Sequence, residues 1–165
     1  MKFRSVHRRY VDADPAVVGR LIDTLSSAED RLWPGETWPR MRFTAGLNAG
    51  SHGGHGPVRY TVERHEAGKE IVFRFSGDGP PGVTGSHGYQ VRPQGAGCVL
   101  EQLAEGRTYG VARLTWPLAF RPLHDALIED SLDKAEREAT GRAPASPAIW
   151  SPRVRILRRL ARRLA

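Results

Sequence analysis

The feature that most constrains this chain is an alternation of apolar and polar residues with a period of two, running from about residue 41 to about residue 118. Side chains of a β-strand point alternately to opposite faces, so this pattern predicts strands with one buried and one solvated side. Glycine-rich and proline-rich segments separate the runs and predict turns. The pattern indicates an antiparallel sheet. The predicted strands are 41–46, 57–66, 69–77, 85–93, 97–105 and 108–118.

The regions on either side of this pattern predict a further strand and several helices. Residues 2–11 are rich in strand formers, and Asp14 followed by Pro15 is typical of a helix start. A short helix is expected there, and a second short helix is expected from Ser27. Residues 121–140 have apolar residues at helical spacing and are followed by Gly141, which predicts one long C-terminal helix. The fold class expected is therefore α+β.

The charge of the chain is unevenly distributed. The net charge is +7, but six arginines lie in residues 150–165, which contain no acid, and the rest of the chain carries 19 bases and 18 acids. A basic tail is weaker support for nucleic-acid binding than a basic face on a folded domain, and no specific nucleic-acid partner is expected. Cys98 is the single cysteine, which favours a reducing compartment. Without an apolar leader or membrane-spanning run, the sequence predicts a cytoplasmic protein.

Three segments resemble one known superfamily. They are "VDADPAVVGRLID", "GGHGPVRYTVERHEAGKEIVFRF" and "LTWPLAFRPLHDALIEDSLDKAE". In this order they resemble the helix-grip superfamily of START-like, pollen-allergen-like and polyketide cyclase/dehydrase (SRPBCC) proteins, over residues 2–140. The resemblance implies a curved antiparallel sheet of about six to seven strands wrapped on the long C-terminal helix, with a ligand cavity between them. It does not imply one function, because a fold can carry many.

The resemblance divides the chain into a helix-grip domain (1–142), a proline-rich linker (143–152) and a cationic amphipathic helix (153–165). The function expected is binding of a small hydrophobic ligand for transport, sequestration or sensing. The alternative is a cyclase or dehydratase acting on a polyketide-like or aromatic substrate. No cofactor is expected. The residues expected to line the cavity are Trp38, Tyr60, Phe73, Phe75, His87, Tyr89, Trp116, Leu127 and Ser131.

His87 is the weak candidate for a catalytic residue. It shares a predicted strand face with Tyr89 and Val91, so it points into the cavity if that face is concave. Its side chain titrates near neutral pH and could orient a ligand or act as an acid or base. The alternative is a histidine satisfied by a backbone carbonyl or facing solvent.

The segment His52-Gly-Gly-His55 raises the question of a metal site. Zinc needs three or four convergent ligands, and a third would have to come from His65, Asp78 or His87. A flexible glycine-rich turn leading into a strand is the favoured interpretation, so no metal is expected. Such a turn would lie near the cavity mouth.

The C-terminal segment "RVRILRRLARRLA" has leucines on one helical side and arginines on the rest. This pattern is typical of helices that lie on anionic membrane surfaces. The arginines that would contact lipid are Arg155, Arg158, Arg159, Arg162 and Arg163. Packing of the leucines on the same chain, or on a second copy in a homodimer, explains the pattern equally well.

Overall fold

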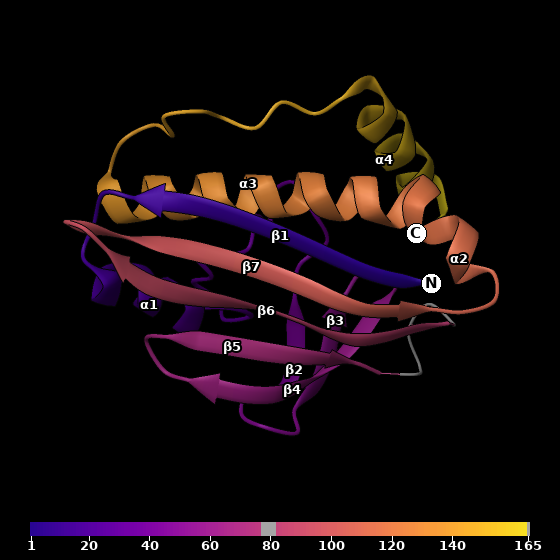
Figure 1. Ribbon diagram of the computed structural model, residues 1–165, viewed down its shortest axis with the longest axis horizontal. Coiled ribbons are helices and arrows are strands. Elements are labelled where there is room, and N and C mark those ends of the chain that lie inside the picture. Colours follow the sequence, from indigo (N-terminus) through magenta and orange to yellow (C-terminus); the bar gives the residue numbers. More distant parts are fainter. Residues whose placement is uncertain (77–81, 165) are drawn as a thin grey trace.

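The computed structural model describes residues 1–76 and 82–164, with side chains described as far as Ala161. Within this part of the chain, seven strands form one antiparallel sheet in the order β1-β7-β6-β5-β4-β3-β2 (Figure 1). The strands are β1 (Lys2–Val11), β2 (Arg42–Leu47), β3 (His52–His55), β4 (Val58–Glu66), β5 (Glu70–Phe75), β6 (Val83–Gln94) and β7 (Gly97–Thr108). The antiparallel sheet predicted from the alternation is confirmed.

The long helix α3 (Arg121–Thr140) lies alongside β1 and covers one face of the sheet (Figure 1). Gly141 ends it with a left-handed backbone (φ 69°) and donates its N–H to the carbonyl of Arg137. Inward residues of the strands and of α3 form the main apolar core, which includes Ile71, Leu100 and Leu132. Burial of this face is what holds the helix to the sheet.

Helix α1 (Pro15–Asp23) is fixed against the hairpin between β4 and β5. Asp14 caps the helix by accepting from the N–H of Ala16. Asp23 accepts from the N–H of Gly68 and from Nε2 of His65. The contact is so close that a Cβ on Gly19 would lie 1.9 Å from the carbonyl oxygen of Gly68. Only glycine fits at position 19 without moving the hairpin.

The second short helix expected after Ser27 is not formed, and residues 24–39 run as turns. The carboxylate of Asp30 accepts from the N–H groups of Ser26, Leu32 and Trp33. A side chain that satisfies several backbone donors in this way stabilises a turn at the expense of a helix. The prediction of a second helix was therefore wrong. Ser27 and Asp30 were interpreted as a helix start, but Asp30 stabilises a turn that no helix follows.

A separate last strand was expected over residues 108–118, but it is not formed, and β7 (Gly97–Thr108) is the last strand of the described sheet. The chain turns at Gly110 (φ 51°) and continues as α2 (Ala112–Thr115) and one π-helical turn, η1 (Trp116–Phe120). Pro117 has no N–H to give to a sheet, which argues against a strand at this point. Pro117 was evidence against a strand in the sequence, but the prediction followed the period-two alternation instead.

The C-terminal helix α4 (Pro152–Leu164) packs on the body of the same chain through its first turns. The guanidinium of Arg158 lies 4.3 Å from the ring centre of Trp38 and 3.8 Å from that of Trp150. Both indole N–H groups donate to Asp130 on α3. Val154 is also buried. Arg158 is thus part of the packing and not a lipid-facing cation as expected.

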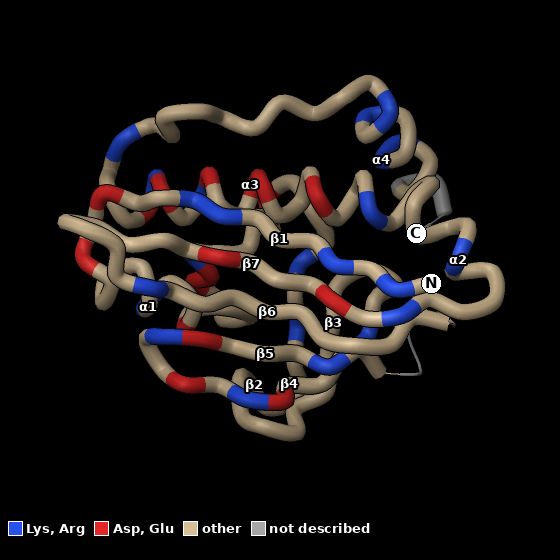
Figure 2. Tube along the Cα trace, in the orientation of Figure 1, with Lys and Arg blue, Asp and Glu red and all other residues tan. Residues whose placement is uncertain are grey.

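Figure 2 shows how the charged residues are arranged around this core. Acidic positions follow α3, and basic positions lie on β1 and α4. Arg9 on β1 contacts three carboxylates of α3, those of Glu129, Asp133 and Glu136. Arg155 and Arg159 are exposed, while the side chains of Arg162 and Arg163 lie outside the described residues.

Candidate ligand-binding site

Polar side chains form a band on the inner face of the sheet, opposite α3. His7 on β1 pairs with Gln102 on β7, which pairs with Tyr89 on β6. In the adjacent row, Ala104 pairs with His87. Paired residues of an antiparallel sheet share a face, so all of these groups point toward the helix.

His87 lies in a cluster of aromatic rings. Its ring centre is 4.6 Å from that of Tyr60, 5.1 Å from that of Phe73 and 4.8 Å from that of Phe75. The side chain is buried, and its Nε2 atom has no hydrogen-bond partner among the described residues. Buried polar atoms are normally satisfied, so this nitrogen needs an explanation. Four residues predicted for the ligand site are thus brought together here.

Tyr89 and Ser131 form a second polar contact across the interior. The Tyr89 hydroxyl lies 3.0 Å from Oγ of Ser131, and Ser131 donates to the carbonyl of Leu32 at 3.0 Å. Since the serine proton goes to Leu32, the Tyr89 hydroxyl is the donor to Ser131. These two predicted residues therefore join the sheet to α3.

The titratable groups of this interior are held neutral at physiological pH. Burial lowers the pKa of His87 well below its usual value and lowers the pKa of His55 to about 3. Burial also raises the pKa of the Tyr60 and Tyr89 hydroxyls. Neutral imidazole and phenol groups can exchange hydrogen bonds with a ligand, but they are poor proton donors and acceptors near pH 7.

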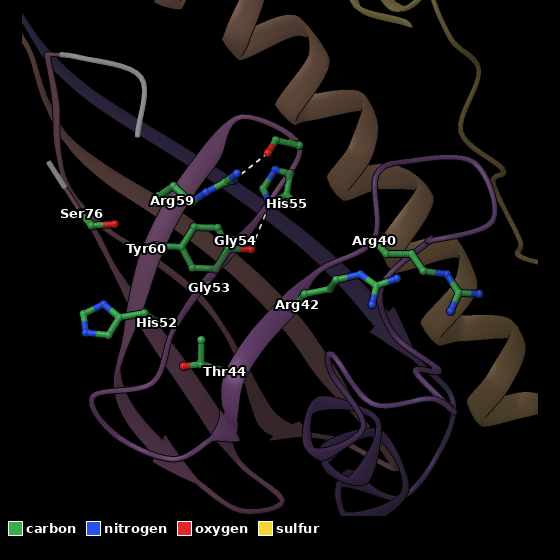
Figure 3. A pocket seen from close by; sticks show the side chains of 11 residues that line it. Arg40, Arg42, Thr44, His52, Gly53, Gly54, His55, Arg59, Tyr60 and Ser76 are labelled. Atoms are coloured by element: carbon green, nitrogen blue, oxygen red, sulfur yellow. Dashed lines mark hydrogen bonds between the residues drawn. The ribbon is translucent and has the colours of Figure 1, made fainter. Parts of the chain in front are cut away.

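A hollow of about 520 Å³ opens at the β2–β3–β4 end of the sheet (Figure 3). Arg40 and Arg42 lie on one side of it, and Arg59 lies beside His55 on the other. None of these three arginines has an acidic partner within ion-pair distance in the described structure. Tyr60 is the floor residue that the hollow shares with the ring cluster around His87. The hollow and the ring cluster are therefore neighbours, separated by Tyr60, which is fully buried.

His55 lines the hollow and contacts the buried Tyr60. Its Nδ1 atom lies 2.9 Å from the Tyr60 hydroxyl, and its ring packs 4.7 Å from that of Trp33. His52, by contrast, is exposed and contacts Oγ1 of Thr61 at 3.1 Å. Residues three apart in a strand point to opposite faces, so the two histidines cannot share a ligand.

The segment His52–His55 is a strand, and the glycine-rich turn expected there is not formed. The glycines allow close strand pairing. A Cβ on Gly53 would lie 2.1 Å from the carbonyl oxygen of Arg42, and one on Gly54 would lie 1.9 Å from that of Val58. Of the further ligands considered, His65 contacts Asp23 and His87 lies beside the Tyr60 ring, while Asp78 lies outside the described residues.

The other three predicted lining residues belong to other contacts of the core. Leu127 is part of the main core. Trp38 belongs to the Arg158 contact. Trp116 sits in a second, smaller cluster with Val83 and Ala112, because it lies on η1 and not on a strand.

Several residues of the site were not anticipated. Gln102 is fully buried, and its Oε1 atom has no partner in the part of the chain that the structure describes. The alternation of Cys98, Leu100, Gln102 and Ala104 did indicate an inward glutamine. Nothing local indicated that Arg40, Arg42 and Arg59 would meet, since β2 and β4 are joined only through β3.

Comparisons with known proteins identify the fold. No family model matches the sequence, and no curated protein matches it. Norcoclaurine synthase from Thalictrum flavum is similar in structure, with a TM-score of 0.62 at 15% identity over 86% of this chain and 96% of that one. The protein has the helix-grip fold. CalU16 from Micromonospora echinospora gives a TM-score of 0.59 at 14% identity over 96% of this chain and 83% of that one. A Thermobifida fusca protein gives 0.63 at 17% identity over 89% and 99%.

These matches confirm the helix-grip fold that the resemblance of the three sequence segments implied. At such identities they establish architecture and carry no substrate or activity to this helix-grip protein. In the described residues, no helix is long and apolar enough to span a bilayer.

Proposed function

We propose that this helix-grip protein binds a small, mainly apolar molecule between the sheet and α3, with His87 as its polar anchor. The observation that carries the proposal is the Nε2 atom of His87, which is buried among aromatic rings and has no partner in the described residues. A ligand hydroxyl or carbonyl would satisfy this atom, while the rings of Tyr60, Phe73 and Phe75 would contact the apolar part.

The electrostatics support binding over catalysis. A general acid or base works best with a pKa near the working pH, and burial moves the pKa of His87 well below that range. The alternative of a cyclase or dehydratase acting on a polyketide-like or aromatic substrate, with His87 as acid or base, would require the bound substrate to raise this pKa. A ligand returned chemically unchanged after incubation supports binding, and turnover that is lost in His87→Phe supports the enzyme.

The hollow at the β2–β3–β4 end suggests how a ligand enters and what it carries. Arg40, Arg42 and Arg59 line this hollow, and an entering ligand would displace His55 and Tyr60 to reach the interior. A carboxylate or sulfonate at one end of an apolar molecule would remain near these guanidinium groups. We therefore expect a preference for apolar acids over neutral molecules of the same size.

Titration with 1-anilinonaphthalene-8-sulfonate tests this proposal, because the dye combines aromatic rings with an anionic group. His87→Phe removes the anchor and keeps the ring packing, and we expect roughly ten-fold weaker binding, the usual cost of one buried hydrogen bond. Arg42→Gln should also weaken binding, but by less. His65→Gln, on the α1 side of the hairpin, is the matched control and should bind as the original protein does. Equal affinity in His87→Phe and the original protein would contradict the proposal.

Native mass spectrometry of untagged protein gives an independent answer. A co-purifying molecule that is retained by the original protein and lost in His87→Phe would identify the ligand class. A co-purifying molecule retained equally by both would place the ligand elsewhere.

We also propose that the α2–η1–α4 end contacts an anionic membrane surface. Val111, Leu114 and Leu118 are 72%, 67% and 60% exposed, a high exposure for side chains of this kind. On α4, Leu160 is half exposed, and Arg155 and Arg159 are exposed. Exposed apolar side chains next to arginines suit the interface of an anionic bilayer.

Sedimentation with vesicles tests the membrane proposal. The full chain should pellet with vesicles of phosphatidylglycerol and phosphatidylcholine, and less with phosphatidylcholine alone. Leu114→Ser combined with Leu118→Ser should reduce binding. Tyr10→Ser, an exposed site on β1, serves as the control. Undiminished binding by the double variant would contradict the proposed surface.

A further inference from the structure

A cluster of metal-ligating side chains lies at the seam between β1 and α3, outside the ring cluster around His87. His7 comes from β1, and His124 and Asp125 come from the start of α3. Each offers one ligand atom, and the three atoms lie within 4.8 Å of one another. All three side chains are partly buried. We propose that His7, His124 and Asp125 bind a divalent transition-metal ion of the zinc type.

The spacing of the ligand atoms fits a metal ion of this size. Nε2 of His7 lies 3.1 Å from Oδ1 of Asp125, and Nδ1 of His124 lies 3.5 Å from the same oxygen. Ligands about 2.0 Å from a tetrahedral ion are about 3.3 Å apart, which falls between these two distances. The third spacing, between the two imidazole nitrogens, is at most 4.8 Å, and side-chain shifts would bring these nitrogens to the distance that the ion needs.

The other nitrogen of His7 is already engaged in the way that metal-binding histidines need. Nδ1 of His7 lies 2.7 Å from Oε1 of Glu129, and Glu129 is in turn held by Arg9. A proton on Nδ1 donated to Glu129 leaves the Nε2 lone pair facing the Asp125 carboxylate. Two acceptors at 3.1 Å repel each other unless a proton or a metal ion lies between them. A carboxylate behind the imidazole is the usual support of a metal-bound histidine.

Gln102 supplies an independent observation on the second histidine. It is fully buried, its Oε1 atom has no partner among the described residues, and its Nε2 atom lies 3.5 Å from Nε2 of His124. Rotating the amide by half a turn exchanges its oxygen and nitrogen. Oε1 then accepts the Nε2 proton of His124, which satisfies this oxygen and directs the Nδ1 lone pair of His124 toward the ion.

The donor set indicates which ions would bind. Two imidazoles and one carboxylate favour Zn²⁺, Co²⁺, Ni²⁺ or Fe²⁺ over Mg²⁺ and Ca²⁺, which prefer oxygen ligands. Three protein ligands leave a further position for water or another small molecule. Oγ of Ser5 lies 3.0 Å from Oδ1 of Asp125 and could bond that water. The site does not depend on an apolar ligand being bound near His87.

The test is metal binding by untagged, chelator-treated full-length protein near neutral pH. Isothermal titration with Zn²⁺ should give one site per chain with micromolar or tighter affinity. Co²⁺ should give visible absorption bands of a low-coordinate site with nitrogen and oxygen ligands. Mg²⁺ should give neither signal.

Variants assign the ligands. His124→Ala should abolish binding, and Gln102→Leu should weaken it by about 10- to 100-fold, as loss of a supporting group usually does. His52→Ala, which removes an exposed histidine on the opposite face, should bind Zn²⁺ as the original protein does. Circular dichroism and thermal melting check that each variant is folded. If His124→Ala is unfolded, Asp125→Asn provides the same test with a side chain of equal size.

Three results would overturn the proposal. They are the absence of Zn²⁺ binding by the original protein, unchanged binding by folded His124→Ala or Asp125→Asn, and loss of binding in His52→Ala. In the first case, a proton shared among His7, Asp125 and Glu129 would explain their close contacts without a metal ion. Failure of the His87 ligand proposal would leave each of these results unaffected.

Discussion

In two pairs of histidines, separation along the chain and proximity in the folded protein do not agree. His52 and His55 are three residues apart, yet one is exposed beside Thr61 and the other faces the interior beside Tyr60. His7 and His124 are separated by most of the chain, yet their rings lie 6.2 Å apart. Strand alternation separates the first pair, and packing of α3 on β1 joins the second. Spacing along the chain is thus a poor guide to a shared site in a sheet protein.

Two regions of the molecule also differ in how far their ion pairs are buried. The seam between β1 and α3 contains largely buried ion pairs, whereas the Arg74–Glu63 pair between β5 and β4 is more exposed. A buried charge that loses its partner is costly, while a surface pair contributes little. The predictions below test this difference, beginning with the largest expected effect.

Replacing Arg9 should have the largest effect on stability. Arg9→Met leaves Asp133 and Glu136 close together and without their cation, so we expect the free energy of unfolding to fall by about 3 kcal/mol. Urea denaturation measures this change. Arg74→Met, which breaks the exposed pair with Glu63, is the control and should cost at most about 0.5 kcal/mol. Equal losses in the two variants would show that the ion pairs of Arg9 contribute no more stability than the exposed pair of Arg74.

Acidification should reveal His55 and not His52. The folded-state pKa of His55 is lowered to about 3 by burial, so its contribution to stability is complete above its usual pKa of 6.5 and is lost as the pH falls. Between about pH 6.5 and about pH 4 we expect a loss of about 3 kcal/mol. Denaturation curves across this range measure the effect.

The control for this titration is in the same strand. His52→Ala should leave the acid-dependent loss unchanged, whereas His55→Phe should reduce it. A protein whose stability is flat over this range would mean that His55 is solvated.

Gln102→Leu should separate stability from metal binding. In metal-free protein, leucine replaces an amide with an unsatisfied oxygen, so we expect the free energy of unfolding to stay the same or to rise by about 1 kcal/mol. In the presence of Zn²⁺, the same variant should gain less stability than the original protein because it binds the ion more weakly. Thermal melting with and without Zn²⁺ measures both changes. A variant destabilised in both conditions would indicate that Gln102 is satisfied in solution.

Much of the fold could be predicted from the sequence because it depends on local periodicity. The alternation in residues 57–66 and 85–93 gave strands with a buried face, and the helical spacing in 121–140, ended by Gly141, gave α3. The predictions failed where a local signal competed with the pattern. Asp30 stabilised turns in place of a helix, and Pro117 belonged to helical turns in place of a strand.

The sequence by itself determined which residues share a face, because side-chain direction follows from the period of the strand or helix. It placed His87 and Tyr89 on one strand face, while the expectation that this face and Ser131 point inward came from the resemblance. Tertiary structure decided which inward residues meet. Strand order, register and the position of α3 set those contacts, and they join His7 to His124, Tyr60 to His55, and Arg158 to Trp38. Such contacts join distant segments through packing that buries the whole apolar face, and no short stretch of sequence contains that information.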